Sequence, residues 1–143
     1  MFILLNSYME KINDSYETQL SAACLLLSVA EADEILQKQE LDTICSILKD
    51  FFSISDDNAY DILHEAQDKI KKSTGLFEFG NHLNSVFDNS DRLDFISCIF
   101  EVAYIDGDLH YLEHHTVKKI ANILNLNRED ILASKIEMED YLN

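Results

Sequence analysis

The chain has 143 residues and carries 27 acidic against 11 basic side chains, a formal net charge of −16 at pH 7. A surface of this sign repels phosphate backbones and anionic lipid, so we expect neither nucleic acid nor a membrane surface as a partner. With no proline and only three glycines, the chain lacks the turn residues that sheets need, which favours an all-α domain of ordinary size.

The chain is expected to form a single domain over 1–143. Its apolar start is too short for a signal peptide or a membrane span, so we interpret residues 1–15 as a helical or extended arm that packs on the core. Apolar residues at helical spacing then predict a succession of helices after this arm. The predicted helical segments are, in chain order, 17–33, 37–52, 55–72, 76–87, 91–105, 109–125 and 127–142.

Two stretches of the chain repeat one another. VAEAD at 29–33 and VAYID at 102–106 align, and apolar positions downstream of each continue to match at the same offset. A repeat of this length indicates a duplicated helix–corner–helix unit. We therefore predict repeat unit one over 17–54 and unit two over 90–126, separated by middle helices over 55–88. The polar residues that the two units share are Asp33 with Asp106 and Glu40 with Glu113.

The second corner brings three carboxylates close together in the sequence. Asp106 and Asp108 flank Gly107, and Glu113 lies one turn into the next helix, so that its carboxylate can point back to the corner. Carboxylates that converge on an oxygen-rich loop bind hard cations such as calcium. The spacing is not that of an EF-hand, and helix capping by Asp108 with an acid in the first turn explains the same residues without a metal. Both interpretations stay open.

The first corner keeps Asp33 and Glu40 but has Glu34 and Ile35 where the second corner has glycine and aspartate. One potential ligand is therefore missing, and any cation is expected at the second corner. A shared site between the corners is the alternative, if the two units pack with pseudo-twofold symmetry.

Two histidines near the second corner suggest a different metal. His110 and His114 are one helical turn apart, a spacing that can chelate zinc, nickel or copper. The sequence reads HYLEH instead of HExxH, so Glu113 is misplaced for a zinc-protease base, and no third ligand or nucleophile is recognisable. We favour surface histidines, and a metal-dependent hydrolase is the least favoured function.

The three cysteines, Cys24, Cys45 and Cys98, are odd in number and lack any metal-binding spacing. They are interpreted as buried, reduced thiols, which indicates a cytoplasmic location. The adjacent Phe51 and Phe52 mark either core or a docking groove, and we favour core.

The phrase VAYIDGDLHYLE and the following IANILNLNREDI resemble the TerB-like tellurite-resistance family, in its short single-domain branch. The likeness is greatest over 95–132, with a diverged first copy over 22–54. The resemblance implies an all-α fold, a compact bundle of about seven or eight helices in two related halves. It also implies a module that works beside protein partners without being an enzyme. The same resemblance implies a divalent-cation site at the positions of Asp33, Glu40, Asp106, Asp108 and Glu113. Tellurite resistance itself is not implied.

We therefore predict a non-enzymatic cytoplasmic module that binds a divalent cation, calcium or similar, at its acidic corners. It would act as a protein-interaction or stress-response adaptor. The alternative is a metal-free domain whose acidic face engages a basic protein. A protein partner is expected in either case, and the sequence does not indicate the oligomeric state.

Overall fold

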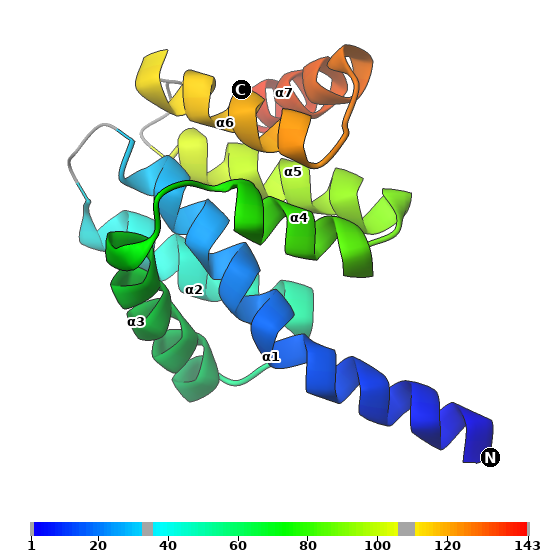
Figure 1. Ribbon diagram of the computed structural model, residues 1–143. Helices are drawn as coiled ribbons and strands as arrows, with labels where there is room; N and C mark the ends of the chain where they lie inside the picture. The colour runs from blue at the N-terminus through cyan, green and yellow to red at the C-terminus, as the bar shows by residue number, and fades with distance from the viewer. Residues whose placement is uncertain (1, 33–35, 106–110, 143) are drawn as a thin grey trace.

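The computed structural model describes residues 2–32, 36–105 and 111–142, and the secondary structure in these ranges is entirely helical (Figure 1). The all-α class predicted from the sequence is confirmed, and the second to seventh predicted segments begin and end close to the observed bounds. The described part of the chain contains these helices: α1 (Phe2–Ala30), α2 (Lys38–Phe52), α3 (Asp56–Lys72), α4 (Phe77–Val86), α5 (Asn89–Ala103), α6 (Tyr111–Ile123) and α7 (Arg128–Leu142).

α1 is the central helix of the bundle. From Thr18 to Ala30 every side chain except Ser28 is buried, and this part of α1 packs against α2, α3, α4, α5 and α6. The sequence explains the position, because apolar side chains cover most of the circumference here and a helix of that kind has to be buried on all sides. Burial of each large apolar side chain contributes about 1.5–3 kcal/mol.

α1 begins at Phe2 instead of near residue 17, so the predicted arm over 1–15 and the first predicted helix form one continuous element. Figure 1 shows the N-terminal turns of α1 extending beyond the other helices. Helix in place of a separate arm follows from the sequence, which has no proline or glycine before Gly75 to interrupt the backbone. The side chains of residues 1–15 lie outside the description, so packing of this segment on the core stays a prediction.

α4, α5 and α6 are held together where α6 ends. A Cβ atom on Gly80 of α4 would lie 2.2 Å from Cγ2 of Ile123, so only glycine allows α4 to approach α6 this closely. Asn84 Nδ2 donates to the carbonyl of Ile123 at 2.5 Å, and Arg92 Nη1 donates to the carbonyl of Leu124 at 3.2 Å. These donors satisfy carbonyls that the end of a helix leaves without an intrahelical partner.

Candidate functional site

The helix ends that flank the two predicted corners lie at one end of the bundle. Figure 1 places the C-terminal ends of α1 and α5 and the N-terminal ends of α2 and α6 at this same end. Asp33, Asp106 and Asp108 lie outside the described residues. Of the five predicted ligands, the structure therefore describes Glu40 and Glu113, and each is the third residue of the helix that follows a corner.

Glu40 and Glu113 are both buried, with 4% and 3% of their surfaces exposed. A glutamate in the first turn of a helix is favoured by the helix dipole, but such residues are usually exposed to solvent. Both residues take part in further interactions in the structure. Glu40 Oε1 accepts a hydrogen bond from the backbone N–H of Gln37 at 3.3 Å, as half of a capping box. A capping role therefore explains the position of Glu40 at the first corner, whereas the sequence suggested capping only at the second.

Within the ranges that the structure describes, no three side chains of the types histidine, cysteine, aspartate and glutamate converge closely enough to hold a metal ion. Because three of the five predicted ligands are outside these ranges, the cation site stays a prediction.

His114 is half-buried on α6, while its predicted partner His110 is outside the described residues. Burial lowers the pKa of His114, and the positive charges of Lys118 and Lys135 lower it further. Its Nδ1 atom is buried and has no hydrogen-bond partner among the described residues. Two nearby lysines disfavour a bound cation as well as a protonated ring, so these surroundings do not support a transition-metal site.

A groove between α2 and α5 is the feature that sequence reasoning missed. It consists of two hollows of about 580 and 500 Å³ that share Ile47, Asp50 and Glu101 in their walls. Its floor is apolar, formed by Ile47 and Phe51 of α2 with Cys98 of α5. The walls are acidic, and the carboxylates that line the groove are Asp42, Asp50, Asp91, Asp94 and Glu101.

The carboxylates of the groove affect one another and the thiol on its floor. Partial burial raises the pKa of Glu101 above its ordinary value of 4.5, and the negative charge of Asp50 raises it further. Burial, together with Glu101, Asp94 and Asp50, raises the pKa of Cys98 to about 12. Since the thiolate is the reactive form of cysteine, Cys98 is not an activated nucleophile.

The other cysteines resemble Cys98 in this respect. Cys24 and Cys45 are buried free thiols, as predicted, whereas Cys98 is only half-buried. Burial raises the pKa of Cys24 to about 12 and that of Cys45 to about 11. Chemistry that depends on a thiolate is therefore unfavourable at each of these positions.

Fold, composition and charge together define the class of this protein as a strongly acidic, all-helical domain. A family model described as "Tellurite resistance protein TerB" matches residues 19–135. The chain belongs to the TerB family, and the resemblance seen in the sequence is confirmed. No match is found among curated proteins or among solved structures.

Family membership carries two further points. The TerB family is not a known family of enzymes. The match includes most of both predicted repeat units, but it does not test the internal repeat, which stays a prediction.

Among the described helices, none has both the length and the apolar character that crossing a bilayer requires.

Proposed function

We propose that this TerB-family domain is a non-enzymatic cytoplasmic module that binds a divalent cation, calcium or similar, at its acidic corners. It would work as a protein-interaction or stress-response adaptor. The proposed ligands are Asp33, Glu40, Asp106, Asp108 and Glu113. What supports the proposal is the burial of Glu40 and Glu113 at the same position of two helices that begin at the same end of the bundle.

Burial of a carboxylate is unfavourable unless its charge is compensated, so a buried glutamate in a first turn has a role that an exposed one lacks. Calcium takes six to eight oxygen ligands, and carboxylates supply most of its charge compensation in proteins. At the second corner, Glu113 follows two aspartates within a few residues. A cation there would join the end of α5 to the start of α6 and fix the angle between these helices, and with it the surface offered to a partner.

The test is isothermal titration of chelator-stripped protein with calcium, magnesium, manganese and zinc. We expect saturable binding of at least one ion, and loss of that binding in Asp106→Asn/Asp108→Asn and in Glu113→Gln. The matched control is Asp61→Asn/Asp68→Asn, which removes the same charge as the double variant from exposed positions on α3. Unchanged affinity in both corner variants, or no binding at millimolar ion, would contradict the proposal.

The alternative, a metal-free acidic interaction domain, is favoured by a different observation. The groove between α2 and α5 has acidic walls and an apolar floor, and neither of the two proposed cation ligands that the structure describes lines it. A basic protein partner could use this groove with or without a cation at the corners. Its association rate would fall with added salt, because electrostatic attraction across the interface is screened.

A further inference from the structure

The α2 wall of the groove is one continuous face of that helix. Its lining positions recur in pairs one turn apart, from the first turn of α2 to the last: Lys38, Gln39, Asp42, Thr43, Ser46, Ile47, Asp50 and Phe51. At a rise of 1.5 Å per residue, this face is about 20 Å long, which matches a partner helix of three to four turns.

The α5 wall follows the same pattern. Asp91, Asp94, Cys98 and Glu101 are spaced by three or four residues, so they also share one face of their helix. The two faces meet over the floor of Ile47, which is 6% exposed, and the half-buried Phe51 and Cys98. The result is a groove with an apolar floor in the half that contains Phe51 and Cys98, polar side chains over the first turns of α2, and carboxylates on both walls.

Three of the groove carboxylates form no polar contact that would stabilise the described part of the fold. Asp50, Asp94 and Glu101 form no hydrogen bond or ion pair with another described residue. Asp42 and Asp91 each accept one hydrogen bond, from the Tyr60 hydroxyl and from the Asp88 backbone N–H. Of the described residues that line the groove, Lys38 alone is basic. The negative charge of this groove is thus largely left uncompensated by the domain.

We propose that the groove between α2 and α5 binds a cationic amphipathic helix of a partner protein. An apolar stripe of this helix would lie over Ile47, Phe51 and Cys98, with lysine or arginine on both sides facing the two acidic walls. The inference rests on the proposed interaction role and gives it a surface and a partner chemistry, but it does not depend on a cation at the corners.

The walls explain why the ligand is a helix. Both are α-helices whose backbone N–H and C=O groups are already paired within the helix, so the groove has no strand edge that an extended peptide could join. A helix satisfies its own backbone groups and can place anchors at i, i+3, i+4 and i+7 in an apolar channel. The charge pattern then selects a basic helix, because an acidic one would meet like charges on both sides.

The raised pKa of Glu101 is consistent with this picture. Its carboxylate is repelled by Asp50 and partly removed from water in the free domain. A lysine or arginine placed between the two would favour the charged form of both, so binding would relieve a repulsion that is present in the unbound protein.

The experiment uses a fluorescein-labelled helical peptide of leucine and lysine, with leucine at i, i+3, i+4 and i+7, titrated with the chelator-stripped full chain. We expect binding that weakens as salt is raised. Asp50→Lys/Glu101→Lys should raise the Kd about tenfold or more, since both walls then repel the peptide. The matched control, Asp61→Lys/Glu65→Lys, changes the net charge equally at exposed positions of α3 outside the groove, and should raise the Kd much less.

Two further peptides test whether shape and charge are both required. A scrambled peptide of the same composition should bind at least several-fold more weakly, and one with glutamate in place of lysine should not bind. If the scrambled peptide binds equally, or the two double variants weaken binding alike, the attraction is only that of an acidic surface and the proposal is wrong. Because no ion is present, this failure is independent of the calcium titration.

The milder pair Asp50→Asn/Glu101→Gln keeps the test valid if the lysine variant does not fold. Circular dichroism should show that this pair retains its helices. It should still weaken binding of the amphipathic peptide more than Asp61→Asn/Glu65→Gln does, and equal weakening by the two pairs would overturn the proposal.

Discussion

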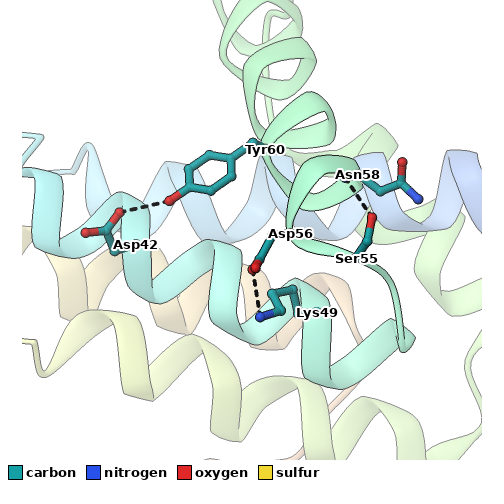
Figure 2. Close-up of polar contacts among 6 residues, drawn as sticks. All are labelled: Asp42, Lys49, Ser55, Asp56, Asn58 and Tyr60. Carbon is teal, nitrogen blue, oxygen red and sulfur yellow. Dashed lines mark hydrogen bonds and ion pairs between the residues drawn. The ribbon is translucent and has the colours of Figure 1, made fainter.

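The two sides of α2 differ in how their charges are used. On the side that faces α3, Lys49 Nζ lies 2.6 Å from Asp56 Oδ1 (Figure 2). Asp42 lines the groove but also contacts α3, because its Oδ1 accepts a hydrogen bond from the Tyr60 hydroxyl at 3.3 Å (Figure 2). On the side that faces α5, Asp50 and Glu101 share a groove without such a contact among the described residues. One side of the helix therefore stabilises the fold, and the other carries like charges close together.

This difference separates structural from functional acidity in a chain with a net charge of −16. The start of α3 shows the structural use, because the Ser55 hydroxyl accepts a hydrogen bond from the Asn58 N–H at 3.2 Å and Asp56 and Asp57 occupy the first turn (Figure 2). The groove acids have no such role at a helix end, apart from Asp91. Repulsion that folding does not relieve is the signature we would expect of a surface that binds a cationic partner.

The largest loss of folding stability is expected for a substitution at Phe51, which belongs to both the groove and the core. Its ring contacts those of Phe52, Phe87 and Phe95 at centroid distances of 5.0, 5.6 and 5.9 Å. Phe51→Ala should lower the free energy of unfolding by about 2–4 kcal/mol through loss of these contacts and the cavity left behind. Chemical denaturation measures the change. Phe77→Ala, at a ring that is 68% exposed, is the control and should shift it by no more than about 0.5 kcal/mol.

A smaller change in folding stability, of opposite sign, is expected for a substitution at Glu101 on the groove side of α2. The pKa of Glu101 is raised in the folded protein, so its charge destabilises the fold above that pKa, and the penalty disappears as pH falls through it. Glu101→Gln should therefore stabilise the domain at pH 7. The gain should be no more than about 0.5 kcal/mol, because this partly buried side chain keeps much of its contact with water. Urea denaturation should show this gain shrinking towards pH 4.5. A loss of stability at pH 7 would contradict the repulsion between Glu101 and Asp50.

The smallest change in folding stability is expected for substitutions on the side of α2 that faces α3. Lys49→Met and Tyr60→Phe each remove one exposed polar contact to a carboxylate, so each should lower the Tm by no more than about one degree. The loss for Lys49→Met should decrease in high salt, since the ion pair is screened. If these variants were more stable than the wild type, as Glu101→Gln is expected to be, the two sides of α2 would not differ as described.

The helices could be predicted closely because their signal is local. Apolar spacing identified α2 to α7. For residues 1–15 the sequence left a helical and an extended arm open, and the helical alternative is the observed one, continuous with the helix predicted to begin near residue 17. The central position of α1 could also be predicted, because apolar side chains at residues 22–27 cover the whole circumference of the helix.

The candidate sites were predictable only in part. Glu40 and Glu113 stood out because the sequence repeats them, but their burial depends on the packing of the corner helices and could not be read from spacing. For the groove, the sequence left Phe51 as either core or part of a docking groove, with core favoured, and it did not indicate the acidic walls. Asp50 and Glu101 each resemble a solvated residue within its own helix, and only the placement of α2 beside α5 makes them neighbours.

The most direct test of the account is to map where the leucine–lysine peptide binds on the ¹⁵N-labelled domain by NMR. The account predicts that amide shifts concentrate on the groove faces of α2 and α5, around Ile47, Asp50 and Cys98. The α3 face that carries Asp61 and Glu65 should be unaffected. Shifts centred on α3 or α7, or spread evenly over the acidic surface, would contradict the claim that the domain reserves one side of α2 for a cationic partner.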